Sequence, residues 1–213
     1  MSEEKKPVRL AGRELDRTCH ACAFFHNREE EFRILLPFAR EGFERGEKLF
    51  NAVDARHRQE RLHRFREAGI DANAAGREGQ VEVRSWEEVH LRESHFDQNA
   101  MLALIEEVLT SGKAGGYGLT RFWANMEWAL EGLPGVEDLV EYETRLNYIL
   151  PKYDDVVVCT YDLNRFGAPV VMDILRTHPM VIVGGILQEN PFYVPPDQFL
   201  RELRERQGQP GAG

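Results

Sequence analysis

The stretch Cys19-His20-Ala21-Cys22-Ala23-Phe24-Phe25 decides the fold class of this chain. Seven residues without an acidic or strongly basic side chain are typical of a buried strand, and a helical pattern follows almost at once. A nucleotide-binding α/β protein has a glycine-rich phosphate loop at such a junction. This chain has His26-Asn27-Arg28-Glu29-Glu30-Glu31 there, with no glycine and three consecutive carboxylates that would repel a phosphate. We therefore expect a nucleotide-binding architecture that has lost its phosphate site, and we expect no ATP as a cofactor.

The length and composition of the chain limit the classes of protein to which it can belong. The chain has 213 residues, which is long enough for one sizeable α/β domain and short for two. Its net charge of -9 argues against a nucleic acid or an anionic membrane as a direct partner. The charged N-terminus lacks the apolar segment of a secretion signal, and the apolar runs are shorter than a membrane span. Three cysteines without a framework spacing fit a reducing cytoplasm, where we expect the protein to reside.

Strand-like and helix-like patterns alternate along the chain. The apolar runs predict strands over 18–25, 49–53, 81–84, 121–126, 156–161 and 180–183, and helical periodicity predicts helices over 32–43, 56–68, 96–109, 136–150, 169–175 and 196–206. This order predicts a three-layer α/β fold, in which a mostly parallel sheet of six or more strands has helices on both faces.

The two ends of the chain differ in composition from its centre. Residues 1–16 are polar, and we expect them to form a loose N-terminal arm. Residues 17–206 contain the alternating elements and are expected to form a single domain. The segment 207–213 is rich in glycine and is expected to be a disordered tail.

The carboxyl ends of parallel strands are where such sheets bind ligands. Glu127 follows the predicted strand 121–126, and Tyr161 and Asp162 end the strand 156–161, so these side chains are candidates for a site. A capping or surface role is equally open for Glu127 and Asp162. His178 precedes a proline between a helix and a strand, and it either faces the site or satisfies the end of the helix.

The spacing of Cys19, His20 and Cys22 first suggests a metal or redox motif. Side chains alternate along a strand, so His20 and Cys22 share one face while Cys19 points to the other. A zinc site needs four ligands, and the chain has no second Cys-x-x-Cys pair. The simplest interpretation is a small buried thiol next to a hydrogen-bonded core histidine, with a metal held by His20 and Cys22 as a lesser alternative. Cys159, within the strand 156–161, is expected to pack in the core.

Five short motifs, in order, resemble the MEDS domain, a sensory domain named for methanogens and methylotrophs. They begin at His20 (HACAFF), Met126 (MEWAL), Cys159 (CTYDL), Arg176 (RTHPMVI) and Asn190 (NPFYVPP). The resemblance covers roughly residues 17–206.

This resemblance implies a degenerate relative of the RecA/KaiC ATPase core, without a phosphate loop, that senses small molecules such as hydrocarbon derivatives. Family members are often fused to DNA-binding or signalling domains, for which 213 residues leave no room here. We therefore expect a stand-alone sensory domain whose output passes through a signalling or transcription-regulatory protein. The resemblance marks six residues as facing the ligand, namely His20, Cys22, Glu127, Tyr161, Asp162 and His178.

Three functional hypotheses follow. The first is a sensory domain without catalysis that binds a small molecule at the strand ends near His20, Cys22 and Tyr161. The second is an enzyme in which Cys22 is the nucleophile and His20 or His178 the base, although residues two apart on one strand lie about 7 Å apart, too far for an easy hydrogen bond. The third is a metal or redox sensor that uses Cys22 and His20, with His178 as an optional third member. Besides the ligand and the regulatory protein, the partners considered include a second copy of the chain in a homodimer.

Overall fold

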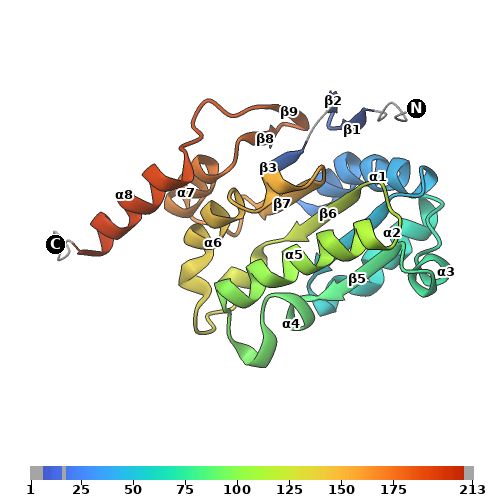
Figure 1. Ribbon diagram of the computed structural model, residues 1–213, viewed down its shortest axis with the longest axis horizontal. Helices are drawn as coiled ribbons and strands as arrows, with labels where there is room; N and C mark the ends of the chain where they lie inside the picture. Colours follow the sequence, from blue (N-terminus) through green and yellow to red (C-terminus); the bar gives the residue numbers. More distant parts are fainter. Residues whose placement is uncertain (1–6, 16–17, 209–213) are drawn as a thin grey trace.

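A seven-stranded sheet forms the centre of the computed structural model, which describes residues 7–15 and 18–208 (Figure 1). The strand order is β5-β4-β6-β7-β3-β8-β9, and all neighbouring strands are parallel except β8 and β9. The strands are β3 (Cys19–Phe25), β4 (Lys48–Val53), β5 (Val81–Ser85), β6 (Thr120–Asn125), β7 (Val156–Asp162), β8 (Met180–Val183) and β9 (Ile186–Glu189). The predicted mostly parallel sheet is confirmed, and each of the six predicted strands is present.

Helices cover both faces of this sheet, so the fold has three layers (Figure 1). The α-helices are α1 (Arg28–Glu44), α2 (Arg58–Glu67), α3 (Ala72–Arg77), α4 (Trp86–Val89), α5 (Gln98–Ala114), α6 (Leu139–Leu146), α7 (Ala168–Thr177) and α8 (Pro196–Gly208). Short 3-10 helices are η1 (Ala55–His57), η2 (Arg92–Ser94), η3 (Glu127–Leu130), η4 (Val136–Asp138) and η5 (Leu150–Lys152). The predicted helix 136–150 is therefore divided into η4, α6 and η5.

The alternation along β3 separates two hydrophobic cores. Cys19, Ala21, Ala23 and Phe25 pack with α1, α2 and α3 on one face, whereas Cys22 and Phe24 pack with α4, α5, α6 and α7 on the other. The prediction that Cys19 and Cys22 face opposite sides is confirmed. We refer to the side covered by α5, α6 and α7 as the α6 face of the sheet.

The junction between β3 and α1 has the chemistry of an ordinary helix start. Asn27 caps α1, because its side-chain oxygen accepts a hydrogen bond of 2.9 Å from the backbone N–H of Glu30. The acidic residues of the first turn lie near the positive end of the helix dipole and favour this helix start. The helix therefore begins without the glycine loop that a phosphate would need.

Two parts of the fold differ from the expectation. Residues 8–15, expected to be a loose arm, form a hairpin of β1 (Val8–Leu10) and β2 (Arg13–Leu15), and the side chains of Val8 and Leu10 are buried. The turn has positive φ angles at Ala11 and Gly12, as a tight two-residue hairpin turn requires. The edge strand β9 was not predicted. Of the expected disordered tail 207–213, residues 207 and 208 end α8, and 209–213 lie outside the described residues.

Close packing against a buried arginine gives a test of this fold. The Arg121 side chain is fully buried, forms ion pairs with Glu41 (3.0 Å) and Glu47 (2.5 Å), and donates to the Phe38 carbonyl. A Cβ atom added at Gly42 would lie 2.6 Å from the Cδ and Nε atoms of Arg121.

We expect Gly42→Ala to lower the free energy of unfolding by about 1–3 kcal/mol, because overpacking outweighs the gain in helix propensity. Urea denaturation of the purified protein measures the change. Gly118→Ala is the matched control, since no atom lies within 4 Å of its added Cβ, and its stability should change by less than about 0.5 kcal/mol. Equal stabilities of the two variants would contradict the packing described here.

Candidate functional site

A cavity of about 200 Å³ lies at the carboxyl ends of the central strands. We refer to it as the strand-end cavity. Its walls include the ends of β3, β6 and β7, the first turn of α1, and Trp86 at the start of α4. Three of the predicted site residues line it, namely Glu127, Tyr161 and Asp162.

A buried carboxylate forms one wall of the strand-end cavity. Glu31 accepts hydrogen bonds from the Trp123 indole (2.7 Å), the Asn125 amide (2.7 Å) and the Arg61 guanidinium (3.1 Å). The guanidinium lies 3.5 Å from the centre of the Trp123 ring. Burial lowers the pKa of Arg61 to about 10, so this side chain stays charged at neutral pH and neutralises Glu31. The anion near the N-terminus of α1 is therefore a carboxylate of the chain itself.

Glu127 has the most unusual protonation in the strand-end cavity. Burial, followed by the negative charge of Glu31, raises its pKa to about 7. Its Oε1 atom accepts a hydrogen bond of 3.2 Å from the backbone N–H of Asp162. The Asp162 side chain accepts from the backbone N–H of Asn164, so it also has the capping role left open above. Near neutral pH, Glu127 can both donate and accept hydrogen bonds.

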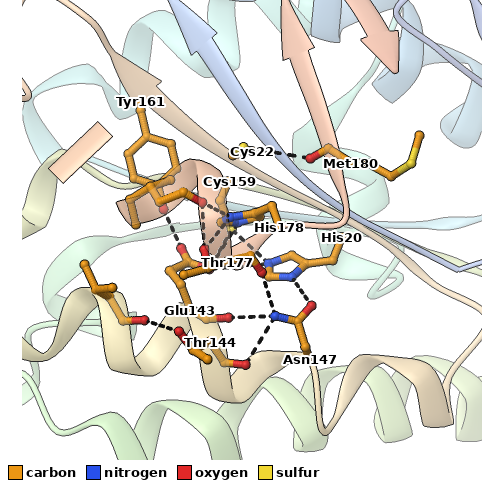
Figure 2. A network of polar contacts seen from close by, with 12 residues as sticks. His20, Cys22, Glu143, Thr144, Asn147, Cys159, Tyr161, Thr177, His178 and Met180 are labelled. Atoms are coloured by element: carbon orange, nitrogen blue, oxygen red, sulfur yellow. Dashed lines mark hydrogen bonds and ion pairs between the residues drawn. The ribbon is translucent and has the colours of Figure 1, made fainter. Parts of the chain in front are cut away.

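A second group of polar side chains is buried on the α6 face of the sheet. It consists of His20 on β3, Glu143 on α6, Cys159 on β7 and His178 directly after α7, and we refer to it as the Glu143 cluster (Figure 2). The Oε2 atom of Glu143 lies 3.3 Å from His20 Nε2, 3.4 Å from His178 Nε2 and 3.7 Å from Cys159 Sγ. All of these side chains are at most 3% exposed.

The charges of the Glu143 cluster are set by burial and by each other. Burial, together with His178, lowers the pKa of His20, which favours a neutral imidazole. Burial alone would raise the pKa of Glu143, but the charge and hydrogen bonds that His178 and His20 can provide lower it overall. The carboxylate therefore stays ionised.

The predicted site residues divide between these two places. His20 and His178 belong to the Glu143 cluster, whereas Glu127 and Asp162 line the strand-end cavity. Tyr161 reaches both, because it lines the cavity and its hydroxyl donates a hydrogen bond of 2.6 Å to Glu143 Oε1. The expected single pocket with His20 at the strand ends is not formed, since His20 is the second residue of β3 and lies near the opposite end of that strand.

Cys22 lies on the same side of the sheet as His20 but outside the Glu143 cluster. Its sulfur faces the backbone carbonyl of Met180 at 3.8 Å (Figure 2). Cys159, which we expected only to pack, is the thiol that reaches the cluster. Burial, and then the negative charge of Glu143, raises the pKa of both thiols well above the usual range. Thiols that hold their protons are poor nucleophiles, which disfavours the thiol-enzyme hypothesis.

Glu143 was not predicted as a site residue, although the sequence contains a signal for it. Leu139, Tyr142 and Leu146 form the apolar stripe of α6, and all three are buried. Glu143 lies four residues after Leu139 and three before Leu146, which places a carboxylate on the same face. A charged residue within an apolar stripe is expected to have a specific partner.

The chain matches one known protein family over most of its length. Residues 19–179 match the profile of the family described as "MEDS: MEthanogen/methylotroph, DcmR Sensory domain". The chain belongs to the MEDS family. The suspected resemblance is confirmed, and the matched residues include every candidate site residue named above.

A curated relative of this MEDS domain is the transcriptional repressor DcmR of Methylorubrum extorquens, which is 24% identical over 172 residues. The match covers 80% of this chain and 62% of the relative, so the chain spans less than two thirds of that protein's length. The family is described as a sensory domain, and this relative is a transcriptional repressor. Within residues 7–15 and 18–208, no helix has the length and apolar character needed to cross a membrane.

A solved structure confirms the expected similarity to the RecA/KaiC fold. The KaiC-like protein PH0186 of Pyrococcus horikoshii has a TM-score of 0.51 with this MEDS domain, at 16% sequence identity. The alignment covers 78% of this chain and 69% of that one. This similarity shows a RecA-like fold and carries no information about function.

The raised pKa of Glu127 predicts a pH dependence of stability. The folded carboxyl group holds its proton up to a pH of about 7, whereas the unfolded group has the ordinary value of 4.5. Between these values the folded state binds more protons, so the stability contribution of Glu127 falls as the pH rises.

We expect the wild-type protein to lose up to about 3 kcal/mol of stability relative to Glu127→Gln between pH 4.5 and 7.5. Urea denaturation of both proteins across this range measures the difference. Parallel stability curves for the two proteins would show that Glu127 titrates normally.

Proposed function

We propose that this MEDS domain is a sensor that binds a small polar molecule in the strand-end cavity and passes the signal to a regulatory protein. The observation that carries this proposal is the Trp86 side chain. It is buried, it lines the cavity, and its indole N–H has no hydrogen-bond partner among the described residues. An unpartnered buried donor is costly, and an acceptor atom on a bound molecule could satisfy it.

The volume of the strand-end cavity limits the size of the ligand. At about 30 Å³ for each water in the liquid, 200 Å³ corresponds to roughly six or seven water molecules. Pockets for drug-sized ligands are larger, at about 300–1,000 Å³. The proposed ligand is therefore a small molecule and much smaller than a nucleotide.

The charges around the strand-end cavity favour an uncharged polar ligand. Arg28 is paired with Glu60, and Arg61 neutralises Glu31. Glu127 is close to half-protonated at neutral pH, so it can accept from a ligand hydroxyl or donate to a ligand carbonyl. Arg165 and Asp162 also line the cavity and carry opposite charges, so no strong excess of either sign remains to select a charged ligand.

The output of the sensor is proposed from the relative. DcmR is a transcriptional repressor, and we propose that this chain also acts on transcription or signalling, through a protein partner. The cavity is lined by residues from α1, η3 and the segment after β7, so an occupant contacts several elements whose outer surfaces a partner could bind.

A screen of small polar molecules by thermal shift, followed by calorimetric titration, tests this proposal. A ligand of the strand-end cavity should bind Trp86→Phe about 5- to 10-fold more weakly, because one hydrogen bond is lost. Trp128→Phe is the matched control, since the Trp128 indole is also buried and unpartnered among the described residues but does not line the cavity. The control should keep wild-type affinity.

Two results would overturn the proposal. One is that every ligand found binds Trp86→Phe and wild-type protein equally. The other is magnesium-dependent ATP binding with turnover, which would indicate an ATPase.

A further inference from the structure

The Glu143 cluster has the geometry of a metal site. His20, Glu143, Cys159 and His178 each contribute one atom of a type that binds metals, and these four atoms all lie within 4.8 Å of one another. They come from β3, α6, β7 and the segment after α7, so residues 158 positions apart in the chain are brought to one point (Figure 2). The cluster is separate from the strand-end cavity and does not depend on the ligand proposed there.

Hydrogen bonds assign the protons of the two histidines. His20 Nδ1 lies 3.0 Å from Asn147 Oδ1, and the amide nitrogen of Asn147 donates to the Thr177 carbonyl at 2.7 Å, so the amide oxygen faces His20. His178 Nδ1 lies 2.7 Å from Thr177 Oγ1 and 3.0 Å from the Ile174 carbonyl; the Thr177 hydroxyl donates to that same carbonyl at 2.8 Å, so its oxygen is left to accept from Nδ1. Since a carbonyl or amide oxygen can only accept, both Nδ1 atoms carry a proton.

The lone pairs of the two histidines are therefore directed into the cluster. A neutral imidazole that is protonated at Nδ1 has its lone pair at Nε2. Both Nε2 atoms lie within 3.4 Å of Glu143 Oε2, and His178 Nε2 makes no hydrogen bond with a described residue. With both imidazoles neutral, two lone pairs and a carboxylate oxygen face one another, so the cluster is held together either by a proton on one Nε2 atom or by a bound cation.

A bound cation would balance the negative charge of Glu143 and accept the lone pairs of the two imidazoles. In a tetrahedral site the ligand atoms are separated by about 1.6 bond lengths, so zinc bonds of about 2.0–2.3 Å place them roughly 3.3–3.7 Å apart. The distances from Glu143 Oε2 are 3.3, 3.4 and 3.7 Å, and Cys159 Sγ lies 3.9 Å from His20 Nε2. The three distances from Glu143 Oε2 lie within that range, the sulfur–nitrogen distance is slightly longer, and all four atoms lie within 4.8 Å of one another, so small side-chain movements would complete a tetrahedral site.

The surroundings of the Glu143 cluster also match a metal site. Metal-binding histidines usually donate their other N–H to an oxygen, as both do here. The Tyr161 hydroxyl holds Glu143 Oε1, which leaves Oε2 for the ion. We propose that His20, Glu143, Cys159 and His178 bind a divalent transition-metal ion of the zinc class. Binding takes the Cys159 thiolate and releases its proton to solvent, and because protein atoms fill all four positions the site is a closed one.

The full chain, purified without a histidine tag from zinc-supplemented medium, tests this proposal by elemental analysis. We expect about one equivalent of metal per chain. Removal of the metal and addition of Co²⁺ should give the visible bands of four-coordinate cobalt and a thiolate-to-cobalt charge-transfer band. Less than about a tenth of an equivalent of zinc, together with no cobalt spectrum, would overturn the proposal. It would show that a proton between an imidazole and Glu143, and not a metal ion, balances the charge of the cluster.

Variants locate the ion. Cys159→Ser should lose the charge-transfer band, whereas Cys22→Ser, which changes a buried thiol on the same face outside the cluster, should keep it. If Cys159→Ser does not fold, Asn147→Ala removes the oxygen that orients His20 and should weaken cobalt binding about 10- to 100-fold with the band retained. A charge-transfer band that persists in folded Cys159→Ser, or cobalt affinity unchanged in Asn147→Ala, would overturn the assignment.

Discussion

The buried carboxylate of Glu31 is the interaction on which the centre of this fold depends. It belongs to the first turn of α1, and it is held by side chains of β6 and by Arg61 of α2. A buried charge is tolerated only when it is both paired and hydrogen-bonded, and Glu31 meets both conditions. The ion pair of Glu31 with Arg61, together with the hydrogen bonds from β6, therefore fixes the position of the first turn of α1 relative to the sheet. It also places an internal anion beside the helix end at which a nucleotide-binding protein would hold a phosphate.

The second buried carboxylate, Glu143, differs from Glu31 in the atoms that surround it. Glu31 faces N–H donors of indole, amide and guanidinium groups, and so its charge is satisfied by the protein. Glu143 has one strong donor, the Tyr161 hydroxyl, and its other oxygen faces two imidazole nitrogens and a sulfur. The charge of such a carboxylate is balanced either by a proton on one of the imidazoles or, as we propose, by a metal ion. Glu31 therefore has a structural role, whereas Glu143 belongs to the proposed ion site.

Local patterns in the sequence were sufficient for most of the fold. The strand β3 and its switch to α1 were predictable because an uncharged run and a helical period are properties of neighbouring residues. The hairpin of β1 and β2 was missed because strands of three residues have too few positions to show alternation. The strand β9 was missed because only one of its four residues is buried, whereas the equally short β8 is apolar throughout.

The candidate sites were harder to predict because they join distant parts of the chain. His20 and Glu143 are far apart in sequence, and their contact depends on which helix covers which strand. The sequence alone also could not show that Cys159, rather than its neighbour Cys22 on β3, would face Glu143, since the two cysteines are paired in register across adjacent strands. The division of five of the six predicted residues between two places, with Cys22 in neither, has the same cause.

Tyr161 connects the two candidate sites physically. It is one of the residues that line the strand-end cavity, and its hydroxyl is the donor to Glu143 Oε1. A molecule in the cavity that shifts Tyr161 would weaken that hydrogen bond and alter the charge that Glu143 presents to the cluster. An ion in the cluster would in turn hold Tyr161 in place and change the free energy of filling the cavity. Because coupling between two binding sites is reciprocal, each occupant would alter the affinity for the other by the same factor.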